Sequence, residues 1–381
     1  MTTEDGPQRG RVRFPEISSR AYEHPADRSA LVALRTLSGF DVVLRRLSGL
    51  FQERRHRLLY LASGVRVGDR QFRGVDRLYA DAVGTLDLPA RPELYVVQHP
   101  APNSVTLGMD EPFVVVTTAL LDLLDDEELR FTLGHELGHA HSGHAVYQTM
   151  LQHLVRLSAN LGWLPVGYWG LRALIAALRE WSRKAELSGD RAGLLVGQDP
   201  DAALRVHMKT AGGARLSEMD SEAFLAQAAE YDSTGDLRDG VLKLLNLEGQ
   251  THPFAVLRAA ELRRWADSEE YARVLAGDFP RRGDDRSASV ADEVRAAARS
   301  YRDSFDLSAD PLVAVVRDIG GGMVGARDRI FAWMRGPASQ QPPAQPAPSG
   351  SAPSGSAPSG SAPSGSAPEP GAPEPGPSEP G

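Results

Sequence analysis

The chain has 381 residues, a formal net charge of −8 and 41% hydrophobic residues, which is enough for one large or two ordinary domains with a hydrophobic core. The mild acidity disfavours a nucleic-acid-binding protein, because such proteins usually carry a basic excess. The absence of cysteine excludes disulfides and thiolate metal ligands, so any metal site must use histidine, aspartate or glutamate. It also fits a reducing compartment. Since the N-terminal stretch has charges but no apolar signal-like run, we expect a cytoplasmic protein.

Hydrophobic patterning predicts helices around a small sheet. Apolar residues recur at helical spacing over residues 24–63, where Asp27 is a candidate helix cap, and again over residues 67–88. Three short runs rich in β-branched or aromatic residues follow, "PELYVVQ", "NSVTLG" and "PFVVVTT". Helical patterns then dominate to about residue 335, and Asp125 with Glu128 forms a capping-box pattern at their start. We therefore predict an α+β fold that is mainly α-helical, with a small β-sheet beside the first of these later helices.

Composition divides the chain into three parts. Residues 1–25 are predicted to be a flexible N-terminal segment, and residues 26–335 to form the folded domain. Residues 336–381 are rich in Pro, Ser, Gly and Ala and repeat a Ser-Gly-Ser-Ala-Pro unit. Because this tail offers no apolar surface to offset its ordering entropy, we predict that it is disordered. A proline-rich partner-binding segment is the alternative, although the arginine or aromatic residues that usually accompany such segments are absent there.

The stretch "FTLGHELGHAHSGH" carries four of the ten histidines. His135 and His139 are four residues apart, so on a helix both imidazoles project from one face and can reach a single zinc ion. Glu136 can accept a proton from the water that such a metal activates, without being a ligand itself. This is the HExxH arrangement of metallopeptidases, and a solvated polar helix face is the alternative. His141 and His144 lie off the ligand line and are predicted to be solvated or to lie behind the ligands.

A hydrolytic zinc site needs a third protein ligand and one open position. The run "REWSRKAELSGDRAGLL" offers Glu186 and Asp190, four residues apart on a helical pattern. Glu186 can bind the metal, and Asp190 can orient a ligand imidazole from behind. A charged helix surface is the alternative, and the neighbouring basic residues favour it when this run is considered alone.

The run over residues 103–144, followed by "ELSGDRAG", resembles the HtpX / type I CAAX prenyl protease family of zinc metallopeptidases. The similarity extends over about residues 24–258 and includes, in the family's order, the strand that begins with asparagine, the strand ending in Thr-Thr, the acidic helix start, HExxH and a downstream ExxxD. The resemblance implies a zincin-type domain that binds one Zn²⁺ per chain and cleaves a protein or peptide. It implies the following roles: His135, His139 and Glu186 as ligands, Glu136 as catalytic acid and base, and Asp190 as a supporting carboxylate.

Members of this family often carry a His-Pro pair followed by an arginine, and this chain has "THPFAVLR" in the corresponding region. By that resemblance, His252 is expected to stabilise the oxyanion of the tetrahedral intermediate or to cap the zinc in a resting state. Arg258 is then expected to pair with a carboxylate such as Asp190. A histidine before a proline at a helix start, and a surface salt bridge, are the respective alternatives.

Membrane members of the family carry transmembrane helices between HExxH and the third ligand, and this chain has only residues 157–178 as a candidate. Arg172 interrupts that stretch, and a single crossing would place His139 and Glu186 on opposite sides of a bilayer. Too few residues separate the ligands for two crossings, so we predict a helical hairpin. Its tip, residues 162–169, either contacts a lipid surface or a substrate, or packs within the domain or a dimer, which we favour. The oligomeric state is not predicted.

The predicted function is a zinc endopeptidase, in which a substrate strand adds to an edge strand near residues 103–107. One alternative is a catalytically silent scaffold, with its cleft plugged by His252 and its tail recruiting partners. Another is a quality-control protease that is peripheral at a membrane surface, with the hairpin tip as its anchor.

The run "GGGMVG" at residues 320–325 matches a dinucleotide-binding pattern, but no βαβ unit can follow it, so we predict a glycine turn between helices.

Overall fold

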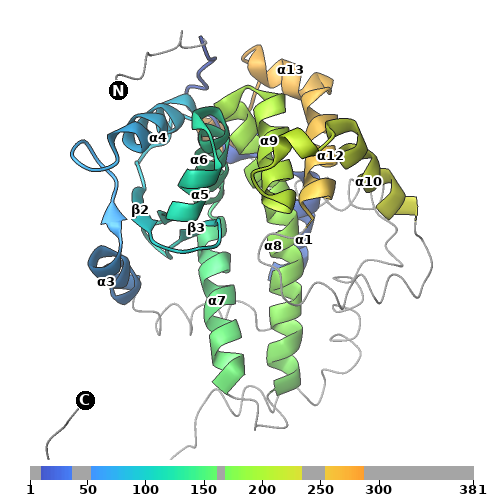
Figure 1. Cartoon of the computed structure of the whole chain (residues 1–381). Helices are drawn as coiled ribbons and strands as arrows, with labels where there is room; N and C mark the ends of the chain where they lie inside the picture. The colour runs from blue at the N-terminus through green and yellow to red at the C-terminus, as the bar shows by residue number, and fades with distance from the viewer. Residues whose placement is uncertain (1–9, 37–52, 161–167, 234–253, 287–381) are drawn as a thin grey trace, which may run out of the picture. The chain divides into compact units, whose positions relative to one another are not determined.

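The computed structural model describes residues 10–36, 53–160, 168–233 and 254–286, all of which belong to one compact unit. Figure 1 shows the arrangement of their helices and strands. The tail at 336–381, the "GGGMVG" run and His252 lie outside the described residues.

Helices dominate the described residues, and a single small sheet accompanies them (Figure 1). The strands are β1 (Val65–Arg66), β2 (Glu93–Val97), β3 (Ser104–Leu107) and β4 (Phe113–Thr117). The α-helices are α1 (Pro25–Thr36), α3 (Glu53–Ser63), α4 (Arg73–Thr85), α5 (Thr118–Leu123), α6 (Asp126–His141), α7 (His144–Asn160), α8 (Tyr168–Gly197), α9 (Pro200–Gly212), α10 (Ser221–Ser233), α12 (Ala255–Ala266) and α13 (Glu269–Leu275). This confirms the predicted mainly α-helical α+β class.

The sheet has four strands in the order β1-β2-β4-β3. β2 and β4 are parallel, with Leu94 opposite Val114, whereas β1 pairs with β2 and β3 pairs with β4 in the antiparallel sense. The three runs predicted as strands are β2, β3 and β4. The predicted edge strand is also confirmed, because β3 is one of the two outer strands of the described sheet and contacts α6 and α7.

Alternating side chains give the sheet two apolar faces, as the pleat of a strand requires. Leu94, Val96, Val114 and Val116 join Leu133 of α6 in the largest hydrophobic cluster. The intervening side chains form a separate cluster on the opposite face, which contains Tyr95, Leu107, Phe113 and Val115. The largest cluster therefore places the helix that carries HExxH directly against the sheet.

The N-terminal segment differs from the prediction of flexibility over residues 1–25. Phe14, Ile17 and Tyr22 are fully buried in the largest cluster. The amide of Phe14 donates to the carbonyl of Thr85 at 2.9 Å, which ties this segment to the end of α4. These apolar residues have no helical or strand period, so the sequence pattern did not predict that they pack into the core. Residues 1–9 lie outside the described residues.

α6 and α8 approach each other closely because glycines stand at their contact. A Cβ added at Gly138 would lie 2.4 Å from the Cβ of Ala192, and one added at Gly134 would lie 2.6 Å from the Cβ of Val196. Real Cβ atoms essentially never come this close, so each glycine allows a separation that alanine would not. α6 begins at the predicted capping box of Asp125 and Glu128, which fixes where its histidines fall.

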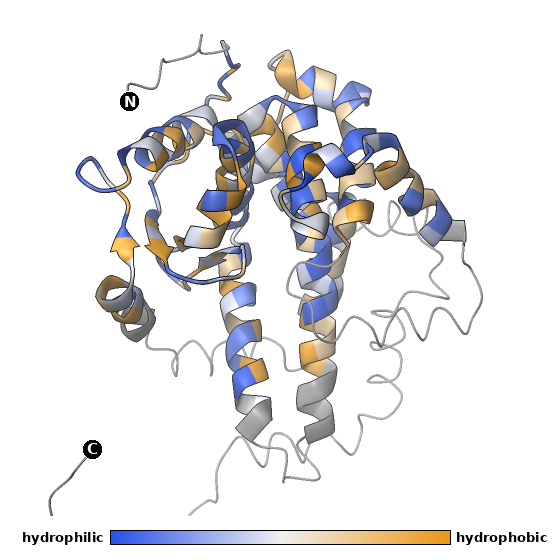
Figure 2. Cartoon of the chain, viewed as in Figure 1, coloured by the Kyte–Doolittle hydropathy of each residue, from blue (hydrophilic) through white to orange (hydrophobic). Residues whose placement is uncertain are grey.

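α7 and α8 run side by side as two long helices (Figure 1), in agreement with the predicted hairpin. Residues 161–167, which include most of the predicted tip and Trp163, lie outside the described residues. Hydrophilic residues recur along both helices (Figure 2). Among the described residues, no helix combines the length and the hydrophobicity that a membrane crossing requires.

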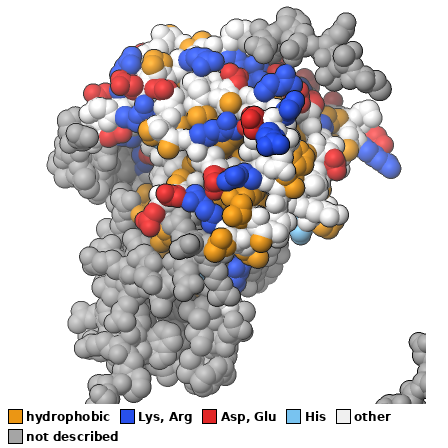
Figure 3. All heavy atoms as spheres, turned by 90° about the vertical axis from the view of Figure 1, so that its left-hand side faces the viewer, with side chains coloured by type: hydrophobic (Ala, Val, Ile, Leu, Met, Phe, Trp, Pro, Cys, Tyr) orange, Lys and Arg blue, Asp and Glu red, His pale blue; other side chains and the backbone are white. Residues whose placement is uncertain are grey.

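Acidic and basic side chains are interspersed on the face of the molecule drawn in Figure 3, with hydrophobic side chains between them. A surface on which the two signs alternate creates no strong field of one sign.

Candidate metal centre

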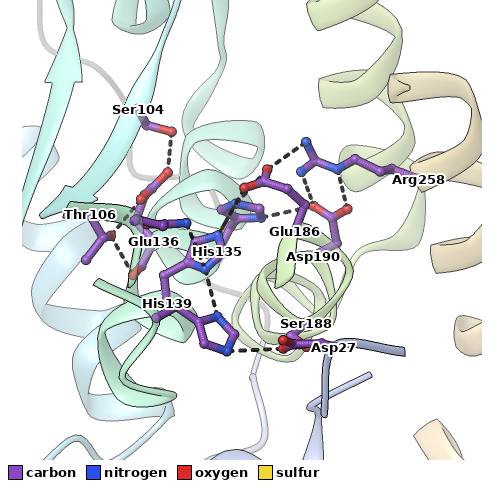
Figure 4. Close-up of polar contacts among 12 residues, drawn as sticks. Asp27, Ser104, Thr106, His135, Glu136, His139, Glu186, Ser188, Asp190 and Arg258 are labelled. Carbon is purple, nitrogen blue, oxygen red and sulfur yellow. Dashed lines mark hydrogen bonds and ion pairs between the residues drawn. The ribbon is translucent and has the colours of Figure 1, made fainter. Parts of the chain in front are cut away.

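Three buried side chains from two helices converge on one point (Figure 4). His135 and His139 come from successive turns of α6, and Glu186 comes from α8. The two histidine Nε2 atoms are 3.0 Å apart, and Glu186 places Oε2 3.6 Å from Nε2 of His135 and Oε1 3.5 Å from Nε2 of His139. The sequence predicted this set, and the structure brings its three members together.

The donor set fits a zinc ion. At zinc bond lengths of about 2.0–2.1 Å, the donors of a tetrahedral site are roughly 3.4 Å apart, close to the separations found here. Each of the three residues is at most 4% exposed, which shields the site from bulk water. Burial is the main reason that the pKa of His139 is lowered, and a neutral imidazole is the form that binds a metal.

Asp190 and Arg258 support this site from the side of α8. Oδ1 of Asp190 lies 3.0 Å from Nδ1 of His135. Arg258, from α12, donates to Asp190 through Nε at 2.7 Å and Nη2 at 2.6 Å, and its Nη1 lies 3.0 Å from Oε2 of Glu186. Although burial raises the pKa of Asp190, the Arg258 guanidinium together with His207 and His135 outweighs burial and holds that pKa well below its usual range. The ion pair expected between these two residues is thus present.

Behind His139, a chain of polar contacts reaches α1. Nδ1 of His139 is 3.0 Å from Nδ1 of His144, whose Nε2 is 3.1 Å from Oδ2 of Asp27. Trp181 and Ser188 also donate to this carboxylate, at 3.0 and 2.6 Å. Burial by itself lowers the pKa of His144, but the charge of Asp27 and its hydrogen bond outweigh burial and raise it. Asp27 is therefore not the cap that the sequence indicated, because its carboxylate binds side chains of α7 and α8.

Glu136 points from α6 toward the edge strand β3 (Figure 4). The hydroxyls of Ser104 and Thr106 each donate to one of its carboxylate oxygens, both at 2.6 Å, and Thr106 also lies 2.9 Å from its backbone carbonyl. Sequence analysis did not single out these two hydroxyls. The signal that was present is their spacing, because residues two apart on a strand share one face.

The other predicted positions have mixed outcomes. His252 lies outside the described residues. His141 is half-buried rather than solvated, with its Nδ1 2.8 Å from the hydroxyl of Tyr22. Burial, reinforced by the charge of Arg282, lowers the pKa of His141 to about 4. Neither His141 nor His144 belongs to the convergent group of ligand atoms.

Two histidines and a glutamate around one point, with a further glutamate held beside them, define the centre of an HExxH metallopeptidase. The sequence model of peptidase family M48 matches residues 69–266, and the chain belongs to this family. It is therefore a metallopeptidase, a hydrolase that cleaves peptide bonds with the help of a metal.

Relatives support this assignment. The chain is 35% identical over 270 residues to the plastoglobule-localized metallopeptidase 48, chloroplastic, of Arabidopsis thaliana, covering 69% of this chain and 77% of that protein. A protease HtpX homolog of Tropheryma whipplei is 30% identical over 165 residues, which is 36% of this chain and 56% of that protein. A protease HtpX homolog of Ralstonia pickettii is 25% identical over 221 residues, 51% of this chain and 74% of that protein. The resemblance to HtpX proteases is confirmed, and no solved structure matches the chain.

Proposed function

We propose that the chain is a zinc endopeptidase in which His135, His139 and Glu186 hold one Zn²⁺ and Glu136 is the general base and acid. The observation that carries this proposal is the convergence of the three ligand atoms, which all lie within 4.8 Å of one another in a buried site. Family membership supports the same reaction. A silent scaffold is the alternative that experiment must exclude.

Zinc bound by these side chains would polarise the scissile carbonyl and activate water for attack. Glu136 takes the proton of the attacking water and delivers it to the leaving amine nitrogen. Ser104 and Thr106 fix the direction of that carboxylate, since each hydroxyl engages one of its oxygens. Arg258 balances the negative charge of Glu186 and Asp190 from behind.

The substrate is proposed to be a protein or peptide that pairs with β3 as an added strand. β3 is an outer strand of the described sheet, and its side chains contact the proposed base. Backbone hydrogen bonds to an edge strand bind extended peptides without strict sequence preference. Such pairing would hold the scissile bond in line between Glu136 and the metal ligands.

Substitution of Glu136 by glutamine tests this proposal most directly. We expect Glu136→Gln to lower kcat by at least about 10²-fold, because the proton transfer is lost, while zinc content stays at one per chain. Asp126→Asn, which changes an exposed carboxylate in the first turn of α6, is the matched control and should leave both quantities unchanged. The measurements are hydrolysis of a casein or quenched peptide substrate and elemental analysis.

Metal removal separates the proposal from the scaffold alternative. A chelator should abolish hydrolysis by the unmodified chain, and added Zn²⁺ should restore it. If the purified chain binds zinc tightly but cleaves none of a broad peptide library, the scaffold is the better description. Full activity of Glu136→Gln in the presence of zinc would contradict the proposed role of this residue.

For its location, we propose a cytoplasmic protein that contacts a membrane surface from one side, through residues 162–169. The relative named as plastoglobule-localized supports a location of this kind. Co-sedimentation with liposomes tests it, and substitution of both Trp163 and Trp169 by alanine should reduce the bound fraction. Equal liposome binding by the unmodified chain and the double variant would contradict a membrane contact through residues 162–169.

A further inference from the structure

A buried carboxylate on α1 has no role in the proposed reaction. Asp27 is 1% exposed, and a charge at such a depth is costly unless hydrogen bonds compensate it. Three donors surround it, namely Nε1 of Trp181, Oγ of Ser188 and Nε2 of His144. Two of these belong to the metal-ligand helix α8, and the third leads to His139 (Figure 4).

The proton positions along this chain of contacts follow from one constraint. Nε2 of His139 faces the other two ligand atoms, so in the metal-binding state that nitrogen must be free of a proton. The proton of the neutral ring then resides on Nδ1 and is donated to Nδ1 of His144. His144 must consequently carry its own proton on Nε2, where Asp27 accepts it. For two neutral imidazole rings, no other arrangement of protons satisfies both hydrogen bonds.

We infer that Asp27 and His144 are positioning residues for the second metal-ligating histidine: Asp27 fixes the tautomer of His144, and His144 fixes the tautomer and ring plane of His139. This inference rests on the proposed metal site. It gives His139 a support comparable to the one that Asp190 gives His135. Ser188 of α8 donates to Asp27 at 2.6 Å, and Asp190, two residues later, contacts His135. This part of α8 therefore helps to position both histidines.

One neighbouring side chain offers a competing explanation. Nε2 of Gln148 lies 3.5 Å from Nδ1 of His139, at the limit of a hydrogen bond, and Oε1 of Gln148 has no partner. A flipped amide would present that oxygen to His139 instead. The contact with His144 is shorter, at 3.0 Å, and His144 is itself held by Asp27. Gln148→Ala therefore distinguishes the two acceptors.

The test is the zinc affinity of the full chain, measured by titrating Zn²⁺ against a chromophoric chelator. His144→Phe keeps the shape of the ring against Trp181 but removes the acceptor for His139. Asp27→Asn keeps the shape but leaves one oxygen to accept from three donors. We expect each change to weaken zinc binding by about 10- to 100-fold. The double variant should bind zinc no more weakly than His144→Phe alone, since Asp27 acts on His139 through His144.

Ser29→Ala is the matched control, because it removes another buried polar group of α1 without touching this chain of contacts. It should bind zinc as the unmodified chain does. Cobalt substitution adds a signature that general destabilisation would not produce, since a tilted His139 should alter the visible absorption of bound Co²⁺ in His144→Phe. Circular dichroism of the metal-free proteins verifies folding, and if Asp27→Asn does not fold, His144→Phe carries the test.

Zinc affinities of Asp27→Asn and His144→Phe within threefold of the unmodified chain would overturn the inference, while leaving the proposed function intact. Strictly additive losses in the double variant, or a loss in Gln148→Ala without one in His144→Phe, would overturn it as well. Failure of the unmodified chain to bind zinc would overturn the inference and the proposed function together.

Discussion

At the scale of single residues, the polar atoms at the site are held in place by partners from other elements. Groups outside α6 contact Nδ1 of His135 and Nδ1 of His139. They also contact the carboxylate of Glu186 and both carboxylate oxygens of Glu136. Side chains held in this way already have the geometry that catalysis requires, so they lose little conformational entropy when substrate binds. The side chains that hold the site residues in place are therefore as informative about function as the proposed metal ligands.

Loss of the hydroxyls of β3 should affect turnover rather than substrate binding. In the combined change Ser104→Ala and Thr106→Val, Glu136 loses both hydrogen bonds and its carboxylate can leave the productive direction. We expect kcat to fall by about 10- to 100-fold, with KM and zinc content nearly unchanged. Steady-state kinetics with a peptide substrate measure this split. A higher KM at constant kcat would instead mean that the hydroxyls bind the substrate.

Removal of Arg258 should destabilise the protein even without metal. Arg258→Met leaves Asp190 and Glu186 as buried carboxylates that have lost their cation, and breaking a buried pair in this way typically costs about 3–5 kcal/mol. Urea unfolding in the presence of a chelator measures this loss. Arg263→Met, on the same helix and more exposed, serves as the control and should change the unfolding free energy little.

At the scale of elements, the contact between α6 and α8 determines the site. The glycines at this contact allow one helix to supply both histidines and the other to supply the glutamate at bonding range. Larger side chains at these positions would hold the two helix axes further apart. The metal geometry is thus a property of the helix pair and not of either helix alone.

Substitution of Gly189 should therefore abolish metal binding. An added Cβ would lie 2.7 Å from Cε1 of His135 and 2.9 Å from Nε2 of His139, so both imidazole rings would have to move. Gly197 ends the same helix, and its added Cβ would meet nothing closer than 3.8 Å. We expect Gly189→Ala to lose zinc and activity, whereas Gly197→Ala should keep both and be up to about 1 kcal/mol more stable. Retention of zinc by Gly189→Ala would show that the helices can separate freely.

At the scale of the whole molecule, buried histidines should make stability depend on pH. Burial lowers the pKa of His207 to about 4, and that of His141 to about 4 as well. The unfolded chain, with histidine pKa values near about 6.5, binds more protons than the folded chain between these limits. Stability should therefore fall as pH drops from 6.5 to 4, by about 1.4 kcal/mol per unit for each fully shifted group.

Urea unfolding of the metal-free protein at pH 7 and pH 5 measures this dependence, with the chelator excluding effects of metal release. His207→Gln removes one of these histidines with a lowered pKa and should make the stability profile flatter over this range. A steeper profile in that variant would show that His207 is not held neutral in the folded protein.

The centre of the site could be predicted from sequence because its chemistry is local. His135, Glu136 and His139 lie within five residues, and helical geometry alone places both rings on one face. The role of Asp27 could not be predicted in this way. An aspartate at a helix start has the pattern of a cap, and its actual partners lie on helices more than a hundred residues later.

In the fold, too, features set by local sequence pattern were predicted, whereas features set by tertiary contacts were not. β2, β3 and β4 were predicted because their residues alternate or are β-branched, whereas β1 has only two residues and gives no periodic signal. Burial of Phe14, Ile17 and Tyr22 also escaped prediction, because these residues reach their partners through tertiary packing alone. The hydroxyls of Ser104 and Thr106 were visible as an alternation, but their partner on α6 was not.

The order in which the proposed ligands occur along the chain has a consequence for biosynthesis. A ribosome delivers both histidines well before Glu186, and Arg258 later still. A nascent or prematurely terminated product that stops short of α8 carries the whole HExxH stretch and yet lacks a complete set of donors. The peptidase would thus remain inert toward its own emerging polypeptide, and toward its translation partners, until most of its catalytic domain has been made.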